Sequence, residues 1–257
     1  MAIEIDLQTT GATLTFDRID FDKDKKAYAQ NLAQDENLAR IANEFVVESD
    51  RNGYAYQWTW CNLPILQLPQ DVLATQDVLF RCRPTVVIET GVAWGGGIAL
   101  YATLMDLYEG RKIFGIDLNL SDGVVEAIND VGFTTEIELI RGSSTDPSMV
   151  SHITHALTPQ DRVMVLMDSN HTHEHVLDEL RAYGPLVSKG QYAIVSDTIV
   201  ENIPEQKHRP RPAGHGDNPM TATRQYLSES SDFEIDADID DRLVMSYSPS
   251  GYLRKVR

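Results

Sequence analysis

Hydrophobic residues recur with two alternating periods from about residue 70 to the end of the chain. Short apolar or β-branched runs predict buried strands at residues 85–88, 112–116, 136–140, 162–167 and 192–195. Apolar residues at helical spacing predict helices between them, at residues 70–82, 98–107, 122–130, 149–157 and 174–186. A later helix at 221–228 and strands at 233–235, 243–247 and 252–256 complete the pattern. Strands that alternate with helices of this length predict a doubly wound, Rossmann-like α/β fold with a mostly parallel sheet.

The first 69 residues lack this alternation and are predicted to form an N-terminal extension to the domain at 70–257. Residues 1 to about 20 alternate only loosely and indicate either an edge hairpin or a partner-binding arm. Apolar residues at helical spacing among many charges predict one or two amphipathic helices over 22–48. Residues 51–69 are crowded with aromatic side chains and have no helical period, so they either line a pocket or plug the sheet.

Composition and charge narrow the class of partner. The 257 residues are 42 % hydrophobic and 24 % charged, which is typical of one soluble α/β domain with an extension. The sequence has no membrane-length apolar run and no signal-peptide pattern at its first residues, so we expect a cytoplasmic location. A net charge of −17 argues against nucleic acid or an anionic membrane as partner and favours a small-molecule substrate.

The strand at 85–88 leads into a candidate cofactor cradle. Glu89 and Gly91 follow the strand directly, and Gly95 precedes a predicted helix. A dinucleotide fingerprint would need glycine where Ala93 stands, and the Glu89 carboxylate would repel a pyrophosphate but suits an ammonium group. Asp117 ends the next strand, where a carboxylate can accept both hydroxyls of a ribose. This set is typical of a class I S-adenosylmethionine (SAM) site, although an ordinary strand-to-helix turn remains the alternative.

Small polar residues follow the third predicted strand. Gly142 and Ser143 stand where an adenine ring can slide in and be held by backbone groups. A plain turn followed by a helix cap explains the same residues equally well.

Two carboxylates and a histidine follow the fourth and fifth predicted strands. Asp168 ends one strand, and Ser196 and Asp197 end the other. Because the carboxyl ends of parallel strands share one edge of a sheet, we expect Asp168 and Asp197 to lie together near the glycine cradle. Carboxylate and hydroxyl oxygens suit Mg²⁺, which can lower the pKa of a substrate hydroxyl. His171 is placed to take the proton, with helix capping as its alternative role.

Residues 203–219 form a proline- and glycine-rich segment that carries a basic island. The basic residues of this segment are Lys207, His208, Arg209, Arg211 and His215. So long an irregular segment inside a compact domain is usually a functional loop or a disordered one. We favour a lid over the active site.

Several motifs together resemble one protein family. They are Trp58-Thr59-Trp60, the run from Leu66 to Asp71, the run from Val87 to Gly97, Gly115-Ile116-Asp117, the run from Leu166 to Leu177, and Gly216-Asp217-Asn218-Pro219. Over about residues 45–256 the chain resembles the cephalosporin hydroxylase family, which is similar to SAM-dependent O-methyltransferases of rhamnosyl and macrolide-sugar groups. The resemblance implies a class I methyltransferase fold, SAM as donor, Mg²⁺-dependent methylation of a hydroxylated small molecule and a homo-oligomer.

The resemblance also implies a metal site, with one departure. Its ligands fall on Asp168, Ser196 and Asp197, and Ser196 stands where the family typically has an acidic residue. Losing a carboxylate lowers the expected metal affinity, so a requirement for metal stays open.

Three hypotheses of function follow. The first is a SAM-dependent O-methyltransferase for a specialised metabolite or a glycosyl group. The second is a non-methylating enzyme, a lyase or cyclase, on the same scaffold. The third is a SAM-binding accessory subunit of an oxygenase. Only the first requires S-adenosylhomocysteine as a product.

Overall fold

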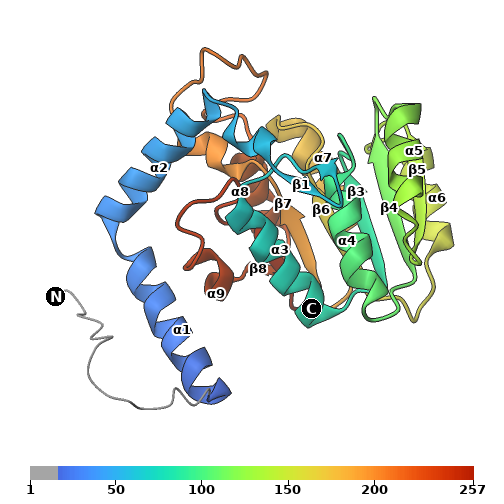
Figure 1. The fold of residues 1–257 in the computed structure, drawn as a ribbon, viewed down its shortest axis with the longest axis horizontal. Coiled ribbons are helices and arrows are strands. Elements are labelled where there is room, and N and C mark those ends of the chain that lie inside the picture. The colour runs from blue at the N-terminus through green and yellow to red at the C-terminus, as the bar shows by residue number, and fades with distance from the viewer. Residues whose placement is uncertain (1–16) are drawn as a thin grey trace.

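The structure is a computed structural model that describes residues 17–257 (Figure 1). The predicted hairpin or arm at residues 1 to about 20 lies almost wholly outside the described residues. The helices, strands and loops that follow account for the rest of the chain.

A seven-stranded sheet forms the centre of the molecule, in the order β5-β4-β3-β6-β7-β9-β8. Its strands are β3 (Val86–Thr90), β4 (Lys112–Asp117), β5 (Glu136–Arg141), β6 (Val163–Met167), β7 (Tyr192–Val195), β8 (Phe233–Ile235) and β9 (Tyr252–Lys255). Strands β3 to β7 pair in parallel, whereas β9 runs antiparallel to β7 and to β8. The chain order reverses between β3 and β6, and such a switch point is where open α/β sheets bind their ligands. The predicted doubly wound fold is confirmed.

Helices cover both faces of this sheet (Figure 1). One face packs against α3 (Pro69–Cys82), α4 (Gly96–Asp106) and α5 (Asp122–Val131). The other packs against α6 (Pro147–Ala156), α7 (His173–Tyr183) and α8 (Pro219–Glu229). Along β3, Val87 faces the first set, while Val86 and Ile88 face the second. Burial on both faces explains why the strands read as continuous apolar runs rather than alternating ones.

Two helices precede the aromatic segment, where the sequence predicts one or two amphipathic helices over 22–48. They are α1 (Arg18–Ala33) and α2 (Glu36–Asp50), and the side chains of Asp17 and Asp35 cap their first backbone N–H groups. Of these, α2 buries an apolar face, whereas α1 does not. Only Ala29 of α1 is buried, so this helix lies along the surface. No helix among residues 17–257 is long and apolar enough to cross a membrane.

The aromatic segment at 51–69 is more regular than its sequence indicates. It contains a 3₁₀ turn, η1 (Tyr54–Gln57), and a two-stranded hairpin of β1 (Thr59–Trp60) and β2 (Leu63–Pro64). The hairpin sits against the start of α4, because a Cβ on Gly96 would lie 2.3 Å from the carbonyl oxygen of Pro64. The segment therefore packs beside the glycine cradle.

The chain between β8 and β9 differs most from its prediction. No strand forms at 243–247, and a short helix, α9 (Ala237–Asp240), precedes this stretch. The buried carboxylate of Asp71, at the start of α3, accepts hydrogen bonds from the Ser246 hydroxyl and from the Tyr247 backbone N–H. A distant side chain thus holds this stretch in place of a strand partner.

Candidate active site

The glycine cradle lies at the carboxyl ends of β3 and β6. Gly91, Ala93 and Gly95 all have positive φ, at 92°, 48° and 87°. A Cβ on Gly91 would stand 2.1 Å from the carbonyl oxygen of Asp168, so only glycine fits where the chain leaves β3. The turn is therefore locked against the end of β6.

Glu89 points from β3 toward the start of α4. Its Oε1 accepts a hydrogen bond from the Tyr101 hydroxyl at 2.7 Å, and a Cβ on Gly97 would lie 2.3 Å from the same oxygen. Its other oxygen, Oε2, is buried without a partner. Burial raises the pKa of the Glu89 carboxyl to about 8, and the Tyr101 hydrogen bond opposes that shift. An orphaned carboxylate oxygen in this position suits a cationic group of a ligand.

Asp117 joins the loops that follow β3 and β4. Its Oδ2 accepts from the Ala93 N–H at 2.9 Å, and its Oδ1 accepts from the Asn119 N–H at 2.7 Å. The Gly142 N–H donates to the backbone carbonyl of Asp117 at 3.1 Å, which brings the loop after β5 to the same edge. Ser143 follows, with its hydroxyl 3.1 Å from that of Thr145. All six residues predicted for the cofactor thus lie at or after the carboxyl ends of the neighbouring strands β3, β4 and β5.

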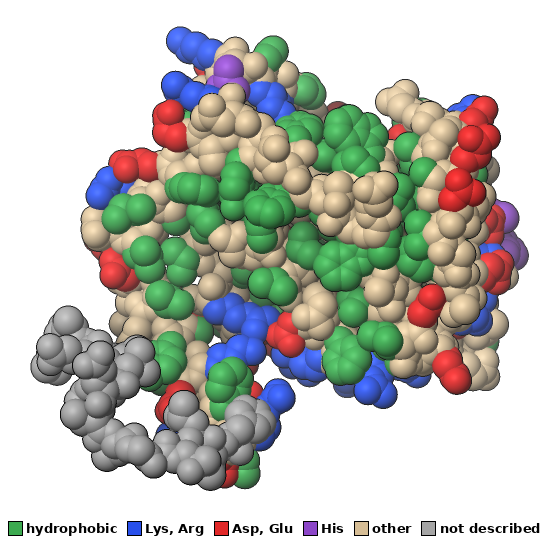
Figure 2. Space-filling view, viewed as in Figure 1, with side chains coloured by type: hydrophobic (Ala, Val, Ile, Leu, Met, Phe, Trp, Pro, Cys, Tyr) green, Lys and Arg blue, Asp and Glu red, His purple; other side chains and the backbone are tan. Residues whose placement is uncertain are grey.

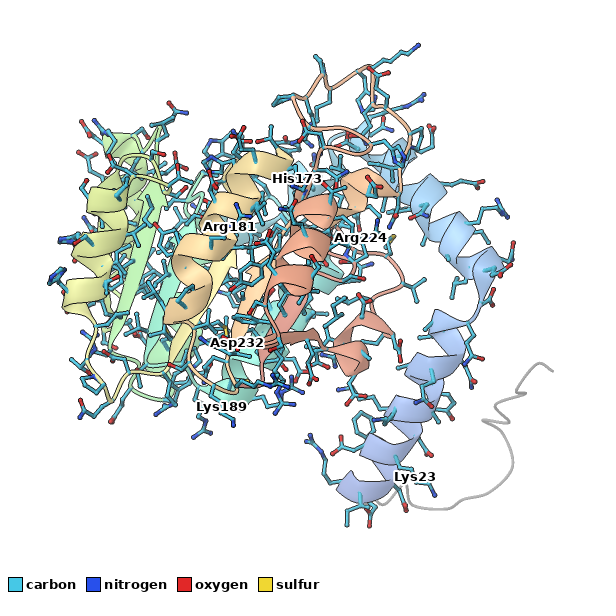
Figure 3. The ribbon with its side chains drawn as sticks, turned by 180° about the vertical axis from the view of Figure 1, so that it is seen from behind. Lys23, His173, Arg181, Lys189, Arg224 and Asp232 are labelled. Atoms are coloured by element: carbon cyan, nitrogen blue, oxygen red, sulfur yellow. The ribbon has the colours of Figure 1, made fainter. Side chains whose placement is uncertain are left out.

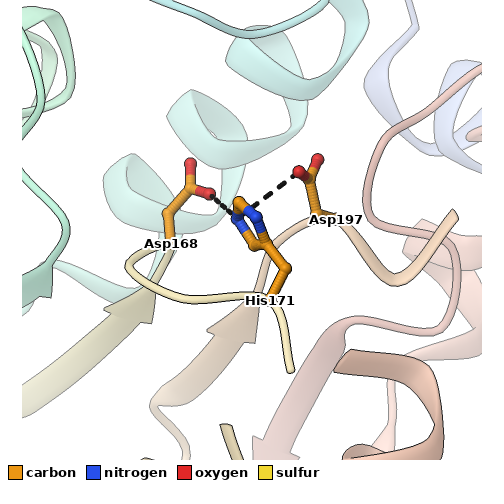
Figure 4. Close-up of side chains that lie close together, drawn as sticks. All are labelled: Asp168, His171 and Asp197. Atoms are coloured by element: carbon orange, nitrogen blue, oxygen red, sulfur yellow. Dashed lines mark hydrogen bonds and ion pairs between the residues drawn. The ribbon is translucent and has the colours of Figure 1, made fainter. Parts of the chain in front are cut away.

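Asp168, His171 and Asp197 form the chemical centre of the site (Figure 4). Their potential ligand atoms all lie within 4.8 Å of one another. His171 Nε2 is 3.3 Å from Asp168 Oδ1 and 3.4 Å from Asp197 Oδ2. Adjacent strands position the two carboxylates, because the Ser196 N–H donates to the Met167 carbonyl at 2.9 Å. This is the convergence at one sheet edge that the sequence predicts.

His171 carries a positive charge between the two carboxylates at neutral pH. Burial favours its neutral form, but the charge of Asp197 and the hydrogen bond to Asp168 outweigh burial and raise its pKa to about 9. Burial raises the pKa of Asp168, whereas the hydrogen bond from His171 opposes that shift. The carboxylates of Asp168 and Asp197 are therefore stabilised by a positive charge between them.

The residues of the site fit both predicted ligands, Mg²⁺ and SAM. Two carboxylates on neighbouring strands offer hard oxygen ligands for Mg²⁺, and Ser196 lines the same cavity. The cradle at Gly91 has no room for a side chain, and the buried Glu89 Oε2 has no partner, as the ammonium end of SAM requires.

A cavity of about 190 Å³ opens onto this centre. Besides the three residues of the centre, its lining includes Tyr56, Gln67, Asp71, Arg209 and Tyr247. Burial raises the pKa of the Asp71 carboxyl to about 7, and the hydrogen bonds from Ser246 and Tyr247 oppose that shift. The sequence predicts no site role for Asp71 or Tyr247, and it places Arg209 only in the basic island of the predicted lid. The motif that ends at Asp71 and the basic island around Arg209 were the available signals.

The loop at 203–219 rises beside α2 (Figure 1) and gathers basic side chains on the molecule's surface (Figure 2). His208 Nε2 lies 2.8 Å from Asp50 Oδ2, and Arg209 Nη1 donates to Asp50 Oδ1 at 3.0 Å. The Arg209 guanidinium also lies over the Tyr56 ring, 5.5 Å from its centroid. The loop is thus tied to the end of α2 and to the aromatic segment, beside the cavity.

The other two histidines of this region have packing roles. His173 begins α7 beside α8 (Figure 3), and its ring nitrogens lie 2.8 Å from Thr221 Oγ1 and 2.9 Å from Gln225 Oε1. His175 Nε2 lies 3.2 Å from Ser144 Oγ and 3.1 Å from Ser169 Oγ. Neither histidine contacts Asp168 or Asp197, so His171 is the histidine of the site.

The chain is similar in sequence to known O-methyltransferases. The profile described as Rhamnosyl O-methyltransferase/CmcI matches residues 52–256. The Rhamnosyl O-methyltransferase of Mycobacterium tuberculosis (strain H37Rv) is 26 % identical over 186 residues, which cover 71 % of this chain and 72 % of that protein. The enzyme of the same name from Mycobacterium leprae is 25 % identical over 198 residues, with 76 % and 82 % covered.

Solved structures share the fold. A structure of CmcI with Mg and SAM has a TM-score of 0.54 at 20 % identity and covers 79 % of this chain and 78 % of its own. The O-methyltransferase TomG from Streptomyces achromogenes, solved with SAM, has a TM-score of 0.51 at 15 % identity, with 95 % and 100 % covered. At these identities the likeness bears on the fold alone.

Proposed function

The chain belongs to the Rhamnosyl O-methyltransferase/CmcI family, and we propose that it methylates a hydroxyl of a small molecule at the centre formed by Asp168, His171 and Asp197. It is a SAM-dependent O-methyltransferase. The observation that carries the proposal is the position of His171 between two carboxylates, directly beside the glycine cradle.

Glu89, Gly91, Gly95, Asp117, Gly142 and Ser143 are proposed to hold SAM. Glu89 Oε2 offers a buried carboxylate oxygen to the ammonium group. Asp117 keeps acceptor capacity for the ribose, because each of its oxygens accepts only one hydrogen bond from the backbone. Gly91 packs its backbone against that of Asp168, which keeps the cofactor turn next to the catalytic centre.

Asp168 and Asp197 are proposed to hold Mg²⁺, together with the Ser196 hydroxyl. The ion would lower the pKa of an acceptor hydroxyl bound beside it. It would also weaken the attraction that keeps His171 protonated, since both carboxylates would then face a second positive charge.

His171 acts as the base of the proposed reaction. The neutral imidazole takes the proton of the acceptor hydroxyl as the oxygen forms its bond to the methyl carbon, and the bond from that carbon to the sulfonium sulfur breaks. S-adenosylhomocysteine and the methyl ether are the products. Asp168 holds the ring through its hydrogen bond to Nε2.

The acceptor class follows from the relatives. The mycobacterial relatives are named for the rhamnosyl group, which supports a glycosyl acceptor. We propose a glycosyl group or a specialised metabolite as the acceptor of this chain.

We also propose that residues 1–69 are an extension to a methyltransferase domain at 70–257. Copies of the chain are proposed to associate through α1 and α2, where Tyr28 and Ile41 are exposed.

Methyl-labelled SAM tests this function. Labelled SAM and Mg²⁺ are incubated with a set of rhamnosides, other glycosides and catechols, and S-adenosylhomocysteine and labelled ether are both measured. We expect both products from the wild type and a fall of at least about a hundredfold in Asp168→Asn. Asp178→Asn, an exposed aspartate on α7, is the matched control and should keep its rate. Consumption of SAM without S-adenosylhomocysteine would instead indicate a lyase or cyclase.

A further inference from the structure

The basic loop encloses a second cavity that the proposed reaction does not use. Its volume is about 580 Å³, within the range of small-molecule sites. The cavity beside Asp168 is only about 190 Å³ and also borders Gly91 of the cofactor cradle. An acceptor of ordinary size therefore needs space beyond the smaller cavity.

Arg209 connects the two cavities, because it lines both. The larger cavity is also lined by Lys207, Arg211 and His215, against one acidic side chain, Glu205. In a protein with a net charge of −17, such a concentration of positive charge marks a place for an anion.

Two basic residues of the loop share one acidic partner at the end of α2. Both His208 and Arg209 contact the carboxylate of Asp50, whose side chain is 3 % exposed. These contacts anchor the loop, whereas Arg211 points to a different carboxylate, that of Asp197.

Arg211 is held weakly. Its side chain is 17 % exposed, and its Nη1 reaches Asp197 Oδ2 only at 3.5 Å. Its Nε is buried, with no hydrogen-bond partner in the described part of the chain. A buried N–H without an acceptor is costly, and the guanidinium fork binds paired anionic oxygens through Nε and one Nη together. A ligand with such a group satisfies this side chain once the guanidinium turns from Asp197 toward the cavity.

Arg211 and the catalytic centre share one carboxylate. The oxygen that Arg211 approaches, Asp197 Oδ2, is also 3.4 Å from His171 Nε2. When Asp197 binds a metal ion, less of its charge is available to Arg211. Binding of the metal therefore favours transfer of Arg211 to an anionic group of the acceptor.

We propose that the acceptor carries an anionic group with paired oxygens, a carboxylate or a phosphate ester, which binds in the larger cavity to the Arg211 guanidinium. This assignment rests on the proposed function, since it gives the substrate class of the same site. Arg211 is a specificity-determining residue, and Lys207 adds positive charge to the same cavity.

Binding of three matched sugars tests the assignment without turnover. Glucuronate, glucose 6-phosphate and glucose are titrated calorimetrically into the full chain in the presence of S-adenosylhomocysteine and Mg²⁺. At least one of the two anions should bind about tenfold or more tightly than glucose, and the comparison between them identifies the preferred group. Equal affinities for all three, including no binding of any, would overturn the proposal.

Variants test whether the preference for the anionic sugars depends on Arg211. Arg211→Gln should abolish the preference, Arg211→Lys should keep only part of it because the fork is lost, and Lys207→Gln should weaken it. Lys189→Gln, at the opposite end of the sheet from His173 (Figure 3), removes the same charge and should leave the preference intact. An undiminished preference in Arg211→Gln would contradict the proposal. Mg²⁺ affinity is measured in parallel, so that an indirect effect through Asp197 is recognised.

Different results would contradict the methyltransferase function and the anionic acceptor. Methyl transfer to neutral acceptors, without any preference for the anions, contradicts the anionic acceptor and leaves the methyltransferase function intact. An anion preference that depends on Arg211, without methyl transfer to any acceptor, supports the anion site and contradicts the proposed function.

Discussion

Gly91 and Asp168 are in contact at the carboxyl ends of β3 and β6, where a Cβ on Gly91 would stand 2.1 Å from the Asp168 carbonyl oxygen. One residue belongs to the cofactor cradle and the other to the catalytic centre. Their contact fixes the distance between the two sites through the backbone itself, independently of side-chain rotamers. Four predictions test this arrangement and its electrostatics.

Replacing Gly91 by alanine should damage folding and cofactor binding together. The new methyl group would overlap the end of β6 at a φ of 92°, so we expect a loss of roughly 2–5 kcal/mol in the free energy of unfolding. Gly190→Ala is the control, since its φ is 83° but nothing lies within 4 Å of the added Cβ, and it should lose only about 1 kcal/mol. Urea unfolding measures both. Equal losses would show that backbone strain alone matters at Gly91.

Ser196→Asp should strengthen metal binding. A third carboxylate next to Asp197 adds a hard ligand, so we expect roughly a tenfold gain in Mg²⁺ affinity. The same change adds repulsion among carboxylates, so the variant should melt at a lower temperature than the wild type in chelator. Thermal melts with and without Mg²⁺ measure the difference. A variant whose melting temperature responds to Mg²⁺ as the wild type does would count against a metal at this position.

The stability contributed by His171 should depend on pH. Its folded-state pKa of about 9 lies above the unfolded value near 6.5, so the contribution is complete below about pH 6.5 and is lost as the pH rises through about 9. In chelator, the difference in unfolding free energy between wild type and His171→Gln should therefore shrink from pH 6 to pH 9.5. A difference that stays constant with pH would contradict the charged bridge.

Binding of S-adenosylhomocysteine should release a proton from Glu89 near neutral pH. The Glu89 carboxyl, with a pKa raised to about 8 by burial, is mostly protonated at pH 7, and an ammonium group placed beside it favours the carboxylate. Calorimetry in two buffers of different ionisation enthalpy measures the release. Glu89→Gln keeps a partner for Tyr101 and should remove most of the buffer dependence. An unchanged dependence in the variant would assign the proton to another group.

Much of the fold could be predicted because its signals are local. The apolar runs at β3 and β6 are buried on both faces, and the glycines between 91 and 97 mark the tight turn from β3 into α4. The convergence of Asp168 and Asp197 followed from a general property of parallel sheets, without knowledge of any side-chain contact.

The features that escaped prediction depend on contacts between distant residues. The stretch at 243–247 alternates like a strand, yet it bonds to Asp71, which lies 175 residues away from Ser246. The position of Arg211 depends on a proline-rich loop that is held through Asp50, and no local pattern connects those two residues.

The metal site at Asp168 and Asp197 is tested by titration of Mg²⁺ into the chelator-treated protein, saturated with S-adenosylhomocysteine. We expect single-site binding in the wild type and in Asp178→Asn, and its loss in Asp168→Asn. We also expect proton release at pH 8, as the ion replaces the charge of His171 between the carboxylates. Equal Mg²⁺ binding by Asp168→Asn and the wild type would contradict the assignment of the metal, and with it the proposed role of this centre.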